Sequence, residues 1–230
     1  MSFFKKVKQI PWWGYALGVL YFALQYAMYR FGDFLSQVIG TKANAWCPKI
    51  PFIDDMIGVV PFFVVFYIFS YVFWICAPMA VSLTKRSHFL NYIIGLSAAY
   101  IVGFLIFTFF PSYMDRAAEG LLNFTSNGGL FETLLAGIYS SDGGTMAFNM
   151  CPSYHCLISL YCYLGVHGQP EISKGFKIYS AVMAILIWLS TMLTKQHYFL
   201  DTVVGISIAL ICYLVVKAIN PGEKIMAKRA

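Results

Sequence analysis

Six apolar runs, separated by short polar segments, dominate the hydrophobic pattern of this chain. Because a helix needs about 20 mainly apolar residues to cross a bilayer, runs of this kind predict transmembrane helices. They lie near residues 11–29, 57–83, 89–110, 154–167, 177–194 and 199–218. The fourth and fifth runs are short, so their helices can extend into the adjoining loops. The pattern predicts an all-α fold, an integral membrane bundle of six helices that forms a single domain over residues 1–230.

The first two runs carry additional signals. Pro61 and Pro78 lie in the second run, where a proline inside a helix bends or ends it. Three lysines precede the first run, as they do in a secretory signal. We favour a retained span, because the run reaches Tyr29 and shows no small-residue cleavage pattern.

Composition agrees with a membrane setting. Of the 230 residues, 60% are hydrophobic and 11% are charged, and the mean hydropathy is +0.69, which is too apolar for an ordinary soluble domain. The net charge is +6. The basic residues are scattered over short loops without a common patch, which argues against nucleic acid as a partner. No feature of the sequence indicates an oligomeric state.

The distribution of the basic residues predicts the orientation. With both termini in the cytoplasm, the cytoplasmic segments hold eleven of the sixteen Lys and Arg residues, and the opposite side holds eight of the ten acids. The eleven are Lys5, Lys6, Lys8, Lys85, Arg86, Lys174, Lys177, Lys217, Lys224, Lys228 and Arg229. This positive-inside bias predicts cytoplasmic termini and, for a bacterial host, a place in the plasma membrane.

This orientation brings unusual polar residues to one face of the membrane. They are Ser112, Tyr113, Arg116, Asn149, Ser153, Tyr154, His155, Ser190, Lys195, His197 and Asp201. Ionisable and polar side chains at a membrane boundary are costly, so their clustering predicts a functional site. We expect that site on the extracytoplasmic side.

Two histidines in this cluster predict phosphoryl transfer. His197 and Asp201 are four residues apart, so on a helix the carboxylate can orient one ring nitrogen and leave the other to attack phosphorus. His155 could protonate the departing alkoxide and later activate water. Arg116 suits bidentate phosphate binding better than Lys195 does. This chemistry needs no metal or other cofactor, and no cluster of metal-ligand residues indicates one.

Three motifs carry a family resemblance. Pro152-Ser-Tyr-His155 matches PSxH, and the segment from Ser190 to Asp201 matches SRxxxxxHxxxD except that Thr191 replaces the arginine. A third motif, KxxxxxxRP, matches only at its arginine, Arg116. In these motifs the chain resembles the type 2 phosphatidic acid phosphatase superfamily, most specifically over residues 108–202.

Two departures from the family pattern concern cations. Phe109 stands where the third motif has lysine, and Ala117 replaces its proline. Lys195, two residues before His197, resembles the substitute cation of a branch that includes inositol phosphorylceramide synthase-like proteins. The phosphate-binding pattern is therefore the least complete part of the resemblance.

The resemblance implies a six-helix membrane bundle that acts on a lipid phosphate or a polyprenyl pyrophosphate. It implies that His197 is the nucleophile, that Asp201 orients it, and that His155 is the acid and base. The residues implied to hold phosphate are Arg116, Ser153, Tyr154, Ser190 and Lys195, with Asn149 and Tyr113 in support.

Several alternatives stay open at this point. His197 with Asp201 could be a structural pair, Lys195 could mark the interface by snorkelling, and Arg116 could be a solvated loop charge. Attack by water on the phosphohistidine gives a phosphatase, whereas attack by a lipid alcohol gives a head-group phosphotransferase. We favour the phosphatase, because water is always available at an external site and a transferase needs a second acceptor pocket. A catalytically silent transporter or scaffold is the third alternative.

The loops on the site's side carry further predictions. An apolar stretch near 130–139, within the long connection 111–150, predicts a short helix on the membrane surface that could act as a lid. A second surface element is expected within 30–55.

Cysteines and a sequon complete the picture of these loops. Cys47 could form a disulfide with Cys151, and Cys156 is an alternative partner. Asn123-Phe-Thr125 is a glycosylation sequon on the same side.

Overall fold

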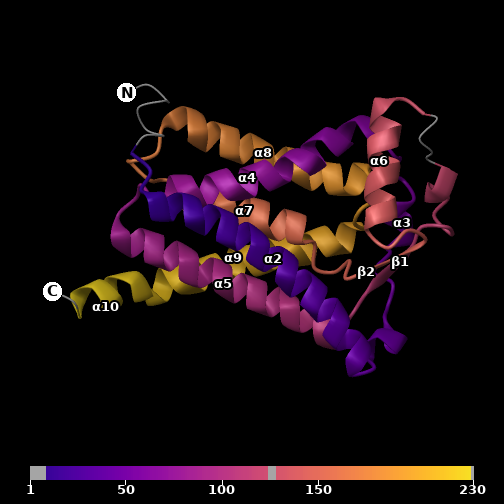
Figure 1. The fold of residues 1–230 in the computed structure, drawn as a ribbon, viewed down its shortest axis with the longest axis horizontal. Helices are drawn as coiled ribbons and strands as arrows, with labels where there is room; N and C mark the ends of the chain where they lie inside the picture. The colour runs from indigo at the N-terminus through magenta and orange to yellow at the C-terminus, as the bar shows by residue number, and fades with distance from the viewer. Residues whose placement is uncertain (1–8, 124–127, 229–230) are drawn as a thin grey trace.

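The computed structural model describes residues 9–123 and 128–228, and six helices in this part of the chain lie side by side in one bundle (Figure 1). They are α2 (Trp12–Val38), α4 (Val64–Val81), α5 (Arg86–Phe109), α7 (Tyr154–Val166), α8 (Lys174–Leu193) and α9 (Phe199–Ile219). Each of the six apolar runs overlaps one of these helices. The all-α prediction is therefore confirmed.

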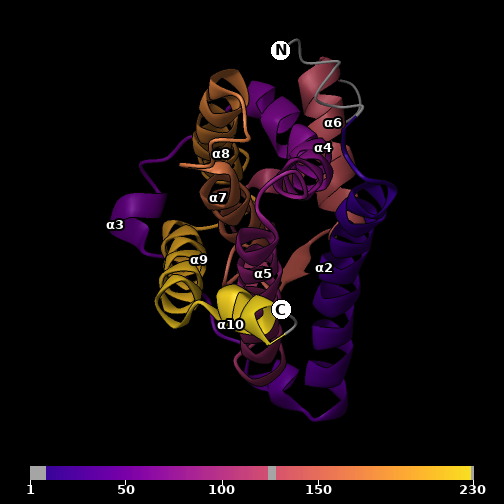
Figure 2. The same ribbon diagram turned by 90° about the vertical axis from the view of Figure 1, so that its left-hand side faces the viewer.

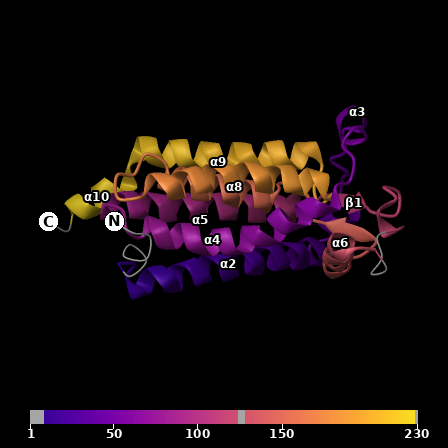
Figure 3. The same cartoon turned by 90° about the horizontal axis from the view of Figure 1, so that it is seen from above.

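Shorter elements gather mainly at one end of the bundle (Figures 1 and 3). They are η1 (Thr41–Asn44), α3 (Pro51–Asp54), η2 (Pro61–Phe63), η3 (Leu121–Asn123), α6 (Leu130–Ser141) and a ribbon of β1 (Tyr113–Asp115) with β2 (Met146–Phe148). The ribbon is antiparallel and pairs Tyr113 with Phe148. A further short helix, α10 (Pro221–Ala227), follows α9 at the opposite end.

Four helical segments of the described chain are long and apolar enough to cross a membrane. They are Pro61–Val81, Arg86–Phe109, Lys174–Leu193 and Phe199–Ala227. Large apolar side chains on their outer faces, such as Phe69, Ile101 and Ile211, are exposed, as expected for helices that face lipid. α7 is apolar but has only 13 residues, and α2 carries Arg30 and Asp33 in its second half. Membrane crossing by all six helices stays a prediction.

The two prolines of the second apolar run lie at different places relative to α4. Pro61 is the first residue of η2, where the N–H that proline lacks would have no helical partner. α4 begins only at Val64 and continues past Pro78 to Val81. Pro78 therefore does not end the helix.

Close contacts fix the start of α7, which packs against α4, α8 and α9 (Figure 2). Gly205 in α9 lies so near that a Cβ added there would stand 2.5 Å from the carbonyl oxygen of Ser153. A Cβ added on Gly103 in α5 would clash with the Tyr154 ring. The Tyr154 hydroxyl donates to the carbonyl of Tyr100 at 2.8 Å. The small residues thus let the PSxH segment sit directly against two neighbouring helices.

The two ends of the bundle differ in what they carry. α2 begins and α10 ends at one end, opposite α3, α6 and the ribbon (Figure 3). The helix expected near 130–139 is confirmed as α6, which runs across the bundle rather than along it (Figure 1). Its role as a lid and the sidedness of the protein stay predictions. Lys5, Lys6, Lys8 and Arg229, on which the orientation partly depends, lie outside the described residues.

The expected disulfide is wrong. All six cysteines are free; Cys47 is exposed, whereas Cys151 and Cys156 are buried. Cys156 lies in the first turn of α7 with its sulfur 3.6 Å from the Thr191 hydroxyl, so it faces α8 and not the loop of Cys47. Of the sequon, Asn123 ends η3, and Thr125 lies outside the described residues.

Candidate active site

A tight turn between α8 and α9 carries His197. The N–H groups of Gln196 and His197 both donate to the carbonyl of Thr191, at 2.9 and 3.0 Å. Lys195 has a φ of 47°, in the left-handed region that L-residues rarely adopt. The hydroxyl of Thr191 donates to the Trp188 carbonyl at 2.7 Å. Thr191 therefore contributes to the site through its backbone, which closes the turn.

Asp201 connects this turn with the PSxH segment. Its Oδ2 accepts the N–H of Tyr198 at 2.9 Å, and its backbone carbonyl accepts the N–H of Ser153 at 2.9 Å. His197 Nδ1 lies 3.4 Å from the same Oδ2, which is an ion-pair distance. The two atoms are not aligned for a hydrogen bond, so the buried His197 Nδ1 has no hydrogen-bond partner among the described residues. Such contacts are often loose in a free enzyme and shorten when substrate binds.

His155 lies in the first turn of α7, inside an aromatic cage. Ser153 caps this helix by accepting the N–H of Cys156 at 3.3 Å. The His155 ring stacks on Tyr67, with centroids 4.0 Å apart, and the Trp74 and Tyr71 rings lie 4.8 and 5.8 Å away. The cage holds the imidazole in one orientation. The spacing of residues 67, 71 and 74 on one helix face was the signal that could have identified the cage from the sequence.

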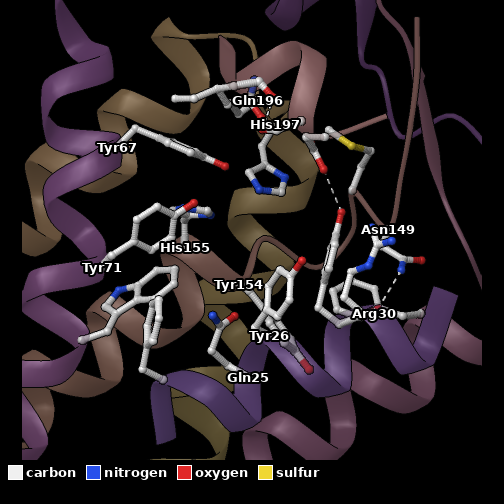
Figure 4. Close-up of a pocket in the computed structure, with 18 residues that line it drawn as sticks. Gln25, Tyr26, Arg30, Tyr67, Tyr71, Asn149, Tyr154, His155, Gln196 and His197 are labelled. Atoms are coloured by element: carbon white, nitrogen blue, oxygen red, sulfur yellow. Dashed lines mark hydrogen bonds between the residues drawn. The ribbon is translucent and has the colours of Figure 1, made fainter. Parts of the chain in front are cut away.

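The two histidines meet at one cavity of about 400 Å³ between α2, α4 and α7 (Figure 4). Their ring centroids are 6.1 Å apart, so one small group can contact both rings. The lining consists of Phe22, Gln25, Tyr26, Tyr29, Arg30, Tyr67, Tyr71, Trp74, Phe107, Ile138, Ser141, Asp142, Asn149, Met150, Tyr154, His155, Gln196 and His197. Among the predicted site residues, the structure thus brings together His155, His197, Tyr154 and Asn149, with Asp201 behind His197.

Buried polar atoms without hydrogen-bond partners concentrate at this cavity. Among the described residues they include Asn149 Oδ1, His155 Nε2 and Gln196 Nε2, all in lining residues. A buried polar group without a partner costs free energy, and such groups are rare in native proteins. Their concentration around one space indicates that a polar ligand completes their hydrogen bonding.

Arg116 does not line the cavity. It is fully buried and donates from Nη1 to the carbonyls of Tyr139, Asp142 and Gly144 at 3.1, 2.7 and 3.2 Å. Its Nη2 pairs with Asp142 Oδ2 at 2.7 Å and reaches Gln196 Oε1 at 3.4 Å. Asp142 does line the cavity, so Arg116 neutralises a carboxylate there while it anchors the segment after α6.

Lys195 also points away from the cavity. Its ammonium donates to the backbone carbonyl of Asp54 in α3, and burial lowers its pKa while Glu119 and Asp54 oppose that shift. The carboxylate of Asp54 accepts the N–H of Phe199 at 2.8 Å and that of Ile50 at 2.7 Å. α3 therefore clamps the turn that carries His197, and Lys195 is part of the clamp.

The other predicted residues surround the site without lining the cavity. Ser190 donates to the Ile187 carbonyl at 2.7 Å within its own helix. Ser153 caps α7, and Tyr113 belongs to the ribbon strand β1. The structure places these side chains at the same end of the bundle as the histidines.

The cavity contains a cation that the sequence analysis missed. Arg30, in α2, is exposed and makes no ion pair or side-chain hydrogen bond with the described residues. Figure 4 shows it beside Asn149, on the same side of the cavity. Asn149 has a φ of 58°, a conformation that asparagine tolerates better than most residues. The sequence did not indicate Gln25 or Gln196 either. Because α2 lies outside the motifs, the only signal for Arg30 was a positive charge at the end of an apolar run.

Comparison with known proteins gives one match. A family model described as the PAP2 superfamily matches residues 39–215, which include both histidine segments and the loops between them. A search of curated proteins and a search of solved structures found no match. Arg30 and Gln25 lie outside the matched range.

The contacts of Arg116 generate a prediction about its role. Arg116→Gln removes most of its hydrogen bonds and leaves Asp142 without a cation, so we expect the free energy of unfolding to fall by about 2–4 kcal/mol. The fall is measurable as a lower melting temperature in detergent. Lys174→Gln removes an exposed charge at the start of α8 and serves as the control. An Arg116→Gln variant that melts like the wild type but has a raised KM for a lipid phosphate would contradict the anchoring role.

Proposed function

The chain belongs to the PAP2 superfamily, and from this membership and the geometry of the cavity we propose that it hydrolyses a lipid phosphate through a phosphohistidine at His197. The superfamily comprises phosphatases and related phosphotransferases, and the protein is an integral membrane protein with long apolar helices.

The observation that carries the proposal is the meeting of His155 and His197 at one cavity with unpartnered polar atoms. A structural histidine pair would have its ring nitrogens satisfied by the protein. Here His155 Nε2 has no partner among the described residues, and His197 has only the imperfectly aligned carboxylate of Asp201. The arrangement fits a nucleophile with an orienting acid on one side of a phosphoryl group and a proton donor on the other.

The proposed reaction has two steps. In the first, His197 Nε2 attacks phosphorus, the bond from phosphorus to the lipid oxygen breaks, and protonated His155 gives its proton to the departing alkoxide. In the second, His155 takes a proton from water, whose oxygen attacks phosphorus, and the bond to His197 breaks to release inorganic phosphate. Asp201 orients the His197 ring and stabilises its positive charge throughout.

The non-bridging oxygens of the phosphoryl group need cationic and neutral donors. We propose that Arg30 and Asn149 supply them, because both line the cavity and Arg30 makes no ion pair in the described part of the chain. One N–H of the Asn149 amide donates to the Tyr29 carbonyl at 3.4 Å, and its second N–H would donate to the phosphoryl group. Arg116, Lys195, Ser153 and Ser190 then act through the turns and helix ends that they hold. Arg30 would then supply the positive charge that the motifs lack at Phe109 and Thr191.

Transfer to a lipid alcohol is the second candidate. It differs only in the group that attacks the phosphohistidine, and superfamily members of both kinds exist. The turn that carries His197 lies at the end of the bundle that we propose to be extracytoplasmic, where water is abundant. We therefore propose hydrolysis as the main reaction.

Substitutions of the two histidines separate their roles. His197→Ala should abolish phosphate release, because no nucleophile is left. His155→Ala should slow release strongly, yet still allow an acid-labile phosphoenzyme to form from a substrate with a good leaving group. The measurement is phosphate release from phosphatidic acid, phosphatidylglycerophosphate and undecaprenyl pyrophosphate, with and without a diacylglycerol or ceramide acceptor, together with intact-protein mass spectrometry. Activity that survives in the His197→Ala variant would overturn the mechanism.

The assignment of Arg30 makes a separate prediction. Arg30→Gln should lower kcat/KM about 10- to 100-fold, since a charge-assisted hydrogen bond contributes about 1.5–3 kcal/mol. Arg30→Lys should recover part of the loss, because a point charge replaces the planar fork. Lys174→Gln, which removes one charge from an exposed helix start, should leave the rate unchanged. Equal kcat/KM in the Arg30→Gln variant and the wild type would exclude Arg30 from phosphate binding.

A further inference from the structure

Gln25 is a buried amide in the middle of α2 that the protein does not satisfy. The residue is 7% exposed, and its side chain makes no hydrogen bond with any described residue. Two buried polar side chains of α4 illustrate the contrast, because both have partners. Ser70 donates to the Tyr67 carbonyl at 2.6 Å, and the indole of Trp74 donates to the Ser159 hydroxyl at 2.9 Å. Gln25 therefore keeps its donor and its acceptor available to a group that enters the cavity.

The position of Gln25 indicates where that ligand lies. Gln25 lines the same cavity as His155, and Figure 4 shows its amide pointing into the cavity on the side opposite Gln196. It precedes Arg30 by five residues, which is about 7.5 Å along the helix axis. Arg30 is nearer the end of the bundle that carries α3 and α6, so Gln25 lies deeper among the apolar helices.

The neighbours of Gln25 are apolar or aromatic. Phe22, Trp74 and Phe107 line the cavity with it, and Arg30, the charged lining residue of the same helix, lies five positions further along α2. An amide in such surroundings recognises a neutral hydrogen-bonding group. A ligand that fills the cavity thus has a phosphoryl group near Arg30 and the histidines, and a neutral polar group about a helix turn and a half deeper.

We propose that Gln25 donates a hydrogen bond to an acyl carbonyl of the substrate and so makes the enzyme selective for lipid phosphates with ester or amide linkages. This inference rests on the proposed function. In such lipids a carbonyl follows the phosphate within a few bonds, toward the chains. In a polyprenyl or simple alkyl phosphate the same depth holds only hydrocarbon, which offers the Gln25 amide no acceptor. The hydrogen bond that only the carbonyl accepts is the basis of the selectivity.

The test compares substrates that differ only in the carbonyl. Wild-type protein in detergent is given diacyl phosphatidic acid, its dialkyl ether analogue and a polyprenyl phosphate. We expect kcat/KM to be about fivefold to tenfold higher for the diacyl lipid than for the ether lipid. Gln25→Leu should lower the diacyl value to that of the ether lipid and leave the ether and polyprenyl values within about twofold. Gln37→Leu, an exposed position on the same helix, is the matched control.

A binding measurement keeps the inference separate from the reaction. The rise in melting temperature of the His197→Ala variant with each lipid reports binding without turnover. Carbonyl-dependent stabilisation that Gln25→Leu abolishes would support the inference even if no lipid is hydrolysed, in which case the proposed function fails alone. Turnover with equal losses on all three lipids would overturn the inference alone. A loss confined to transfer onto added diacylglycerol would assign Gln25 to the acceptor, which also overturns it.

Discussion

The hydrogen bonds of Asp201 hold the two histidine segments in register. Its carboxylate caps the start of α9 through the Tyr198 N–H and lies against His197, while its carbonyl accepts the N–H of Ser153 at the start of α7. Gly205, one turn further along α9, lets the two helices approach closely enough for this contact. The position of His155 relative to His197 therefore follows from one residue that contacts both segments, and the cavity exists because these helix starts are fixed.

Around this centre, the polar groups divide into those that the protein satisfies and those that it leaves for a ligand. Arg116 and Lys195 are buried and bonded to backbone carbonyls, so they stabilise the segment after α6 and the clamp of α3. Arg30, Gln25 and Asn149 line the cavity, and the side chains of Arg30 and Gln25 make no hydrogen bond with the described residues. Because these groups are available to a ligand, this second set is better evidence of binding than motif position alone. The enzyme proposal depends on this division.

Much of the fold could be predicted from the sequence. The apolar runs located all six helices of the described bundle. The spacing of His197 and Asp201 predicted that they approach each other, but His197 lies in the turn before α9 and not on the helix. The motifs correctly selected the histidines that meet at the cavity. The phosphate-binding cations could not be found in this way, because a motif gives the position of Arg116 but not the direction of its guanidinium, which loop carbonyls determine. Arg30 and Gln25 come from a helix outside the motifs, and only the packing of α2 against α4 brings them to the histidines.

The central claim is that the phosphoryl group binds in this cavity, between the histidines and Arg30. A structure of the protein with orthovanadate tests it most directly, because vanadate adopts the geometry of a phosphoryl group under attack. The account predicts vanadium within bonding distance of His197 Nε2, with vanadate oxygens in contact with the side chains of Arg30 and Asn149. Vanadate held by Arg116 or Lys195 outside the cavity, with His197 unoccupied, would contradict it.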